Sequence, residues 1–75
     1  MKLSDLKRGE VAIIKGYVDP ELQLKLMEMG LIVGEKIKVV ETGFFEDPMA
    51  FKVYGYIVSL RRTEANTILI DKITD

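Results

Sequence analysis

A joint between two glycines constrains most strongly how this chain can fold. The stretch LMEMGLIVGEKIKV, residues 26–39, has apolar residues at helical spacing before Gly30 and at alternating spacing after Gly34. Because glycine adopts positive φ angles without steric cost, Gly30 is expected to end the helix. Gly34 is expected to turn the chain into a strand. The sequence therefore predicts an abrupt change from helix to strand at this joint.

The helix before the joint has a well-marked start and one apolar face. Asp19 suits the N-cap position, and Pro20 suits the first helical position, where its missing N–H group costs nothing. Leu22, Leu26 and Met29 follow at helical spacing, so we expect them to face the core. Because that face must be buried, the helix is expected to plug one open end of the fold.

The remainder of the chain predicts short strands separated by turns. Apolar residues alternate along four segments, whereas the first segment is apolar on both faces. With the helix between the first two strands and a strand spacing of about ten residues, the pattern favours a mainly β fold, a small closed or nearly closed barrel. A chain of 75 residues has room for one domain, expected to span residues 1–75. The expected strands are 10–17, 35–41, 49–54, 56–60 and 67–73.

Four further residues have structural interpretations at turns. Pro48 can begin a strand because no amide donor is needed there. Gly55, which separates two strand segments, indicates a bulge or a close turn. Arg61 is expected to form a surface ion pair with Glu64 within a short helical turn.

The composition argues against catalysis and against a tight metal site. The chain contains no histidine and no cysteine, which removes the commonest general base and the usual ligands of transition metals. Its 11 basic and 12 acidic residues give a formal net charge of −1, so no overall charge favours nucleic acid or an anionic membrane. The start of the chain does not have the pattern of a signal peptide, and no apolar run is long enough to span a membrane. We expect a cytoplasmic, non-enzymatic protein without a cofactor and without direct membrane insertion.

The segment GFFEDPM, residues 43–49, is the most unusual feature for function. Two adjacent phenylalanines cannot both point into the core, because neighbouring residues alternate in an extended chain. At least one is expected to be exposed or packed over the mouth of the barrel, and an exposed aromatic residue is a common anchor for a protein partner. The alternative is that one phenylalanine caps the core and the other has no role. Candidate partner contacts are Phe44, Phe45, Asp47 and Met49 from this segment, and Leu24 and Met27 from the helix.

Nucleic-acid binding is the second function class, because small β-barrels often have it. Lys36, Lys38 and Lys52 can share an outer face, and Arg61 and Arg62 add two positive charges. With a net charge of −1, however, alternating lysines are better explained as a solvated face that blocks edge pairing. We therefore expect no nucleic-acid partner.

Several motifs, in order, resemble the FeoA family of small cytoplasmic proteins in bacterial ferrous iron uptake. The opening LSDLKRGEVAII is similar to the start of that family, and the resemblance extends over residues 3–71. The similar features are the Met-Gly-Leu-x-x-Gly joint at 29–34, Asp47-Pro48, Gly55, Leu60-Arg61 and Glu64-Ala65.

The resemblance implies an SH3-like barrel that is an accessory to the membrane iron transporter FeoB, whose cytoplasmic part includes a GTPase domain. That cytoplasmic part is the implied partner, and self-association through spare apolar surface is a further expectation. The family's link to iron does not imply that this chain binds iron. The same domain type occurs at the C-terminus of iron-dependent repressors, so a regulatory domain of a metal-dependent repressor is the alternative. One departure is Glu46, where family members often have glycine before the Asp-Pro pair.

Overall fold

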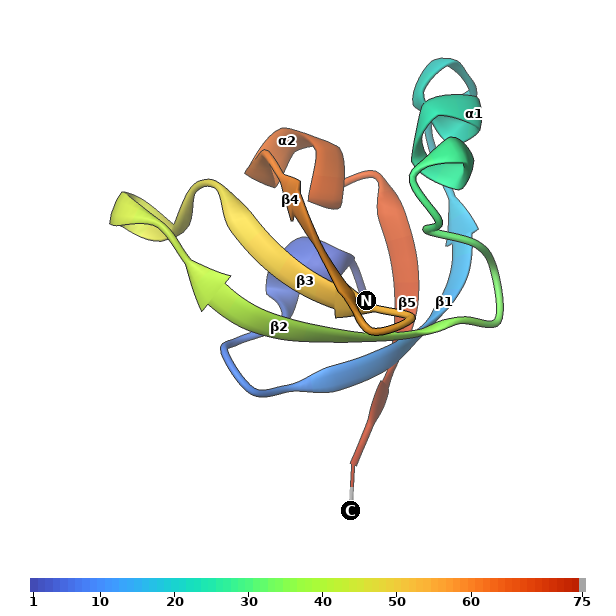
Figure 1. Cartoon of the computed structure of the whole chain (residues 1–75). Helices are drawn as coiled ribbons and strands as arrows, with labels where there is room; N and C mark the ends of the chain where they lie inside the picture. The colour runs from blue at the N-terminus through green and yellow to red at the C-terminus, as the bar shows by residue number, and fades with distance from the viewer. Residues whose placement is uncertain (75) are drawn as a thin grey trace.

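The computed structural model describes residues 1–74, with residue 44 described by its backbone. Five strands form one sheet that curves into a barrel, and one helix stands between the first two strands (Figure 1). Short helical turns complete the chain. In chain order the elements are η1 (Leu3–Asp5), β1 (Val11–Tyr17), α1 (Pro20–Glu28), β2 (Lys36–Thr42), η2 (Phe44–Glu46), β3 (Met49–Val53), β4 (Tyr56–Leu60), α2 (Arg62–Ala65) and β5 (Ile68–Ile73).

The sheet has the strand order β4-β3-β2-β1-β5, and every neighbouring pair is antiparallel. This confirms the mainly β fold of five strands with the helix between the first two. Over residues 1–74, β4 and β5 are the two edges of the sheet, so the barrel is nearly but not fully closed. In the sequence, α2 connects these two edge strands. Irregularities between Ile14 and Gly16 in β1, and between Val39 and Glu41 in β2, increase the bend of the sheet.

The core lies inside the curved sheet and follows the predicted alternation. In β2, Ile37 is fully buried, whereas Lys36 and Lys38 on either side are exposed. The first strand, which is apolar on both faces, buries one face and leaves the other half-exposed. The buried hydrophobic residues are Leu3, Leu6, Ala12, Ile14, Leu26, Leu31, Ile37, Val39, Met49, Phe51, Val53, Val58, Leu60, Ala65, Ile68 and Ile70.

Helix α1 begins as predicted, and its apolar face packs against the core. The Asp19 carboxylate accepts a hydrogen bond from the Glu21 amide at 2.9 Å, as an N-cap does. Leu26 is the fully buried residue of α1, while Leu22 and Met29 pack against the core and remain partly exposed. Figure 1 shows α1 standing at one corner of the molecule, beyond the end of β1. The predicted burial of this face is confirmed, and the closure of one barrel end by the helix stays a prediction.

The glycine joint forms as predicted. Gly30 has a φ of 91°, and its amide donates to the Met27 carbonyl at 3.0 Å. The Leu31 amide donates to the Leu26 carbonyl at 3.0 Å, so both hydrogen bonds of a Schellman ending are present. Gly34 has a φ of 95° and lies in the turn that leads into β2. Positive φ is thus required at both glycines of the joint.

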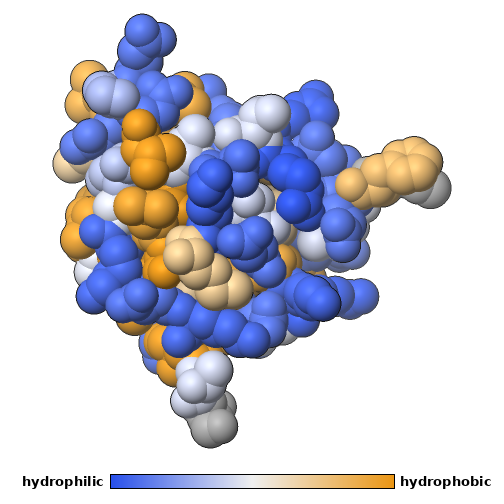
Figure 2. Space-filling view, turned by 180° about the vertical axis from the view of Figure 1, so that it is seen from behind, coloured by the Kyte–Doolittle hydropathy of each residue, from blue (hydrophilic) through white to orange (hydrophobic). Residues whose placement is uncertain are grey.

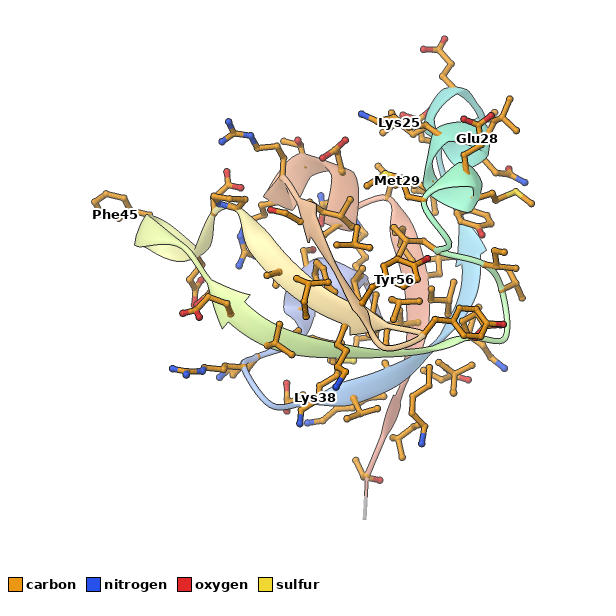
Figure 3. The ribbon with its side chains drawn as sticks, in the orientation of Figure 1. Lys25, Glu28, Met29, Lys38, Phe45 and Tyr56 are labelled. Atoms are coloured by element: carbon orange, nitrogen blue, oxygen red, sulfur yellow. The ribbon has the colours of Figure 1, made fainter. Side chains whose placement is uncertain are left out.

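Two tyrosines hold the joint from either side of Gly30. The Tyr56 hydroxyl donates to the Met29 carbonyl at 3.2 Å, and the Tyr17 hydroxyl donates to the Leu31 carbonyl at 2.5 Å. Figure 3 shows the Tyr56 side chain reaching from β4 toward the chain below α1. A β-carbon at residue 30 would overlap with the Tyr56 hydroxyl. Glycine is therefore favoured at this position by its φ angle, and its missing β-carbon leaves room for the Tyr56 hydroxyl.

Two other turn predictions have different outcomes. Tyr54 and Gly55 have φ angles of 54° and 83°, so the chain between β3 and β4 makes a close hairpin turn, and the bulge is excluded. The predicted ion pair of Arg61 with Glu64 is wrong. The Glu64 carboxylate accepts from the Arg61 backbone amide at 2.9 Å, and its other oxygen lies 3.0 Å from Nζ of Lys25. Glu64 therefore links α2 to α1, a contact 39 residues apart in sequence that local spacing does not reveal.

Candidate functional site

The β2–β3 connection, residues 43–48, is a compact loop that carries most of the predicted contact residues. The Gly43 amide donates to the Pro48 carbonyl at 2.8 Å, and the Glu46 amide donates to the Gly43 carbonyl at 2.9 Å. A β-carbon at residue 43 would lie 2.8 Å from the Asp47 carbonyl oxygen, so glycine lets the two ends of the loop approach. β3 begins directly after Pro48, as predicted. The loop is therefore a defined turn with a hydrogen-bonded base.

Phe45 lies at the tip of this loop and is 96% exposed. Figure 3 shows its side chain projecting from one end of the molecule, away from the barrel. Its φ of 56° is in the left-handed region, which costs a non-glycine residue on the order of 1 kcal/mol. The structure confirms that at least one of the two phenylalanines is exposed. The prediction for the side chain of Phe44 lies outside the described part of the chain.

The backbone conformation of Glu46 explains how this chain departs from the glycine that family members often have at this position. Its φ is 62°, a conformation that glycine adopts readily, so the glutamate keeps the backbone that glycine would have. Arg62 holds Glu46 in place: Nε donates to the Glu46 carbonyl at 3.3 Å, and Nη2 lies 3.4 Å from the Glu46 carboxylate. These contacts offset part of the cost of two consecutive left-handed residues.

Arg62 also joins the loop to two other segments. Its Nη1 donates to the Ser4 carbonyl at 2.9 Å, and its backbone amide donates to the Asp47 carboxylate at 2.9 Å. The Ser4 hydroxyl donates in turn to the Asn66 side-chain oxygen at 2.8 Å. Asp47, a predicted partner contact, therefore has a structural contact with the start of α2. The loop, η1 and α2 are thus bound together beneath the Phe45 tip, an arrangement that the sequence analysis missed.

The other predicted contact residues divide into buried and exposed. Met49 is fully buried, because it begins the inward-facing row of β3. Its side chain is therefore excluded as a surface contact in this structure. Leu24 is 65% exposed and Met27 is 39% exposed, so both side chains are available on the outer side of α1.

The sequence analysis did not single out three exposed apolar residues near α1. Val18 precedes the helix, and Ile32 and Val33 lie in the joint that follows it. Figure 2 shows apolar side chains gathered on the side of the molecule that carries α1. The sequence contained one signal for this surface, the adjacent apolar residues Ile32 and Val33. They lie in a turn, where no strand alternation directs a side chain inward. We call Val18, Leu24, Met27, Ile32 and Val33 the helix-side patch.

Glu64 gives the structure a predicted pH dependence. The Arg61 backbone amide, and then the Lys25 ammonium, lower the pKa of Glu64 below its usual value of 4.5. The unfolded chain takes up this proton at higher pH than the folded chain, so the stabilisation is present above about pH 4.5 and is lost as pH falls through the folded pKa. Glu10, which pairs with Lys72, also has a lowered pKa, so part of the acid sensitivity has a second source.

We expect Glu64→Gln to lower the free energy of unfolding at neutral pH by about 1 kcal/mol, because the charged cap of α2 and its ion pair are lost. The variant should also lose less stability than the parent on acidification from about pH 6 to about pH 3. Denaturant unfolding over that pH range measures both effects. Equal acid sensitivity of the two proteins would contradict this assignment.

The acidic side chains of the described residues do not form a ligand set. Within residues 1–74, no group of three or more Asp, Glu, His or Cys side chains lies together in a way that could hold a metal ion. Over the same residues, none of the helices has the length and apolar character needed to cross a membrane. Two surface features that bear on the predicted contacts are the Phe45 loop and the helix-side patch.

A curved antiparallel sheet of five short strands, with one helix after the first, defines a small SH3-like barrel. Comparison with known proteins identifies the family. Residues 1–72 match the model of the FeoA domain, and the chain belongs to the FeoA family, whose members are accessory domains of ferrous iron transport.

Relatives with known sequences or structures show how far the likeness extends. The chain is 33% identical over 75 residues to the Fe(2+) transport protein A/Fe(2+) transporter FeoB fusion protein of Porphyromonas gingivalis; the match covers 99% of this chain but 9% of that protein. FeoA of Chlorobium tepidum is 33% identical with a TM-score of 0.89, covering 99% of this chain and 71% of that one. FeoA of Stenotrophomonas maltophilia, solved in complex with zinc and described as a prokaryotic SH3 domain protein, is 26% identical with a TM-score of 0.84, covering 95% and 89%. The SH3-like fold that the resemblance implied is thereby confirmed.

Proposed function

We propose that this domain is a non-enzymatic binding module that docks on the cytoplasmic, GTPase-containing part of a FeoB-like ferrous iron transporter, with Phe45 as an anchor. The observation that carries the proposal is the presentation of Phe45. Phe45 is 96% exposed, and its backbone has a positive φ. It lies in a loop that Arg62 connects to the barrel through a hydrogen bond to the Glu46 carbonyl. Strained backbone conformations of this kind cluster at functional sites.

The relative from P. gingivalis supports the choice of partner. In that protein the FeoA and FeoB parts belong to one chain. Covalent linkage keeps two modules at a high effective concentration, which favours their contact. Two separate chains of the same kinds are therefore reasonable partners for each other.

The physical chemistry of the loop favours a binding role. An aromatic side chain contributes a large contact area and loses few rotamers on binding. Because hydrogen bonds already fix the loop at Gly43, Glu46 and Asp47, little additional backbone entropy is lost when a partner binds. The helix-side patch offers a second apolar contact area for the same transporter.

Three carboxylates near the candidate contact surfaces are engaged in structural contacts. Asp47 accepts from the start of α2, Glu64 is paired with Lys25, and Glu35 accepts from the Tyr54 hydroxyl. Together with a sequence that contains no histidine and no cysteine, this supports a role in contact rather than in reaction.

We expect Phe45→Ala to weaken binding to the cytoplasmic region of a FeoB transporter from the same organism by about 1 to 3 kcal/mol, the usual effect of removing an anchor. Calorimetric titration of the purified region measures the affinity. The melting temperature should stay close to that of the parent, because the side chain is almost fully exposed.

Phe45→Trp is the matched control, because it keeps an aromatic surface at the same backbone position. This variant should bind like the parent within a few-fold. Unchanged affinity of Phe45→Ala would exclude the loop as the contact. A loss of affinity that only parallels a loss of folding would show that Phe45 acts through the fold.

A further inference from the structure

Three lysines cover the outer face of the sheet at β2 and β3. Lys36, Lys38 and Lys52 are exposed, and we call them the lysine face. Figure 3 shows Lys38 on the outer side of β2, directed away from the barrel. The three side chains line an open hollow of about 350 Å³, whose other lining residues are Val11, Glu35 and Tyr54.

The lysine face is electrostatically unfavourable for the isolated fold. Lys38 lies directly opposite Lys52 in the register of β2 and β3, and like charges at opposed positions repel each other. Elsewhere in the sheet, Lys15 lies 3.5 Å from the Asp71 carboxylate. Among residues 1–74, the ion pairs include none of the three lysines of the lysine face. Alternation places these lysines on the outer face, but none of these ion pairs within the fold offsets their mutual repulsion.

One carboxylate lines the hollow, and it is already engaged. The Tyr54 hydroxyl donates to the Glu35 carboxylate at 2.6 Å. Three ammonium groups thus face one carboxylate, and the hollow is positively charged although the whole chain has a formal charge of −1. The positive charge is local and is directed outward from the sheet.

Aliphatic side chains flank these lysines. Each lysine has an aliphatic residue directly opposite it on a neighbouring strand, and one row crosses all five strands with two adjacent lysines flanked by aliphatic residues on both sides. Ile57, at one end of this row, is 58% exposed. The row is Ile73, Val11, Lys38, Lys52 and Ile57, and the remaining pair is Ile13 with Lys36.

We propose that the lysine face binds an acidic amphipathic helix of a partner protein, laid across the strands. Neighbouring strands are about 4.8 Å apart, and residues four apart on a helix are about 5–6 Å apart, so two carboxylates at positions i and i+4 can reach Lys38 and Lys52 together. Apolar residues one turn beyond each carboxylate then contact Val11 and Ile57. A nucleic-acid backbone would satisfy the ammonium groups but would leave the flanking aliphatic residues Val11 and Ile57 without apolar contacts.

This surface is independent of the proposed docking through Phe45. The lysine face lies on the outer side of β2 and β3, whereas Phe45 projects from the loop at one end of those strands (Figure 3). The two proposals therefore fail or succeed separately, and the same molecule can use both surfaces at once.

The test uses the full chain and a synthetic helical peptide as the probe. The peptide carries two glutamates at i and i+4, leucines one turn before and after them, and alanine and glutamine elsewhere. Titration into isotope-labelled protein, followed by amide chemical shifts, should give saturable shifts around the lysine face that weaken with added salt. We expect Lys38→Gln to weaken binding by about 5- to 10-fold, whereas the matched variant Lys15→Gln stays within about twofold of the parent. The amide spectrum of each variant shows that it is folded.

Several results would overturn the proposal. One is equal binding of a peptide with glutamine in place of both glutamates, and another is an equal effect of Lys15→Gln and Lys38→Gln. Shifts confined to the Phe45 loop would place the peptide on a different surface. Tighter binding of a single-stranded oligonucleotide or of anionic lipid vesicles than of the peptide, with shifts at the same amides, would assign the lysine face to another class of partner.

Discussion

Replacing Gly30 by valine is expected to lower the free energy of unfolding by about 2 to 4 kcal/mol. Two costs combine at this position. A β-branched residue is strained at a φ of 91°, and its β-carbon would overlap with the Tyr56 hydroxyl. Tyr56 is about half exposed, so its ring can turn aside, but it then gives up its hydrogen bond to the Met29 carbonyl. For a domain of this size such a loss is a large part of the total stability.

Gly34→Val is the matched control for this prediction. Gly34 has a φ of 95°, close to that of Gly30, but a β-carbon there would have no neighbour within 4 Å. The loss of unfolding free energy in Gly34→Val therefore measures the backbone strain alone. Any additional loss in Gly30→Val measures the conflict with Tyr56. Denaturant unfolding of both variants, and of Gly30→Val combined with Tyr56→Phe, separates the two costs. An unchanged midpoint for Gly30→Val would contradict the assignment of Gly30 as the helix end.

Replacing Leu26 by alanine is expected to cost about 2 to 4 kcal/mol, because it removes the side chain that fixes α1 to the core. Leu26 is fully buried, whereas the remaining residues of the helix are half-exposed or exposed. Its carbonyl also accepts the Leu31 amide at the Schellman ending. A cavity at this position therefore loosens both the helix and the joint, and amide hydrogen exchange in α1 should accelerate together with the loss of global stability.

Leu24→Ala is the matched control, since it makes the same chemical change on the same helix. Leu24 is 65% exposed, so its truncation should change the free energy of unfolding by less than about 0.5 kcal/mol. The comparison also separates the two roles of α1. If Leu24→Ala destabilised the fold as strongly as Leu26→Ala, the helix would be packed through its other face, and Leu24 could not belong to an open helix-side patch.

The sequence by itself determined the features that depend on short-range backbone chemistry. Asp19 and Pro20 start the helix, and Gly30 and Gly34 allow the joint, because each requirement concerns a few adjacent residues. The inward and outward faces of β2 and β3 followed from alternation, because successive side chains of a strand point to opposite faces. The presence of an exposed phenylalanine followed from the same rule.

The tertiary structure decided every contact between segments that are distant in the chain. Arg62 is unremarkable in sequence, yet it binds Ser4 and Glu46 and so fixes the loop that presents Phe45. Glu64 pairs with Lys25 instead of the neighbouring Arg61 side chain. These contacts depend on how the curved sheet brings its two edges and α1 together. The spacing of residues along the chain contains no information about which distant segments come into contact.

The lysine face shows the same division within one surface. The alternation in β2 predicted that Lys36 and Lys38 share an outer side. Only the register of β2 with β3 placed Lys52 directly opposite Lys38, and only the registers with β1 and β4 added an aliphatic residue on each side of these two lysines. Register is a property of two paired strands and of the turn that joins them, so a single strand's sequence does not determine it. The sequence determined which side chains face outward, and the pairing of the strands decided which of them became neighbours.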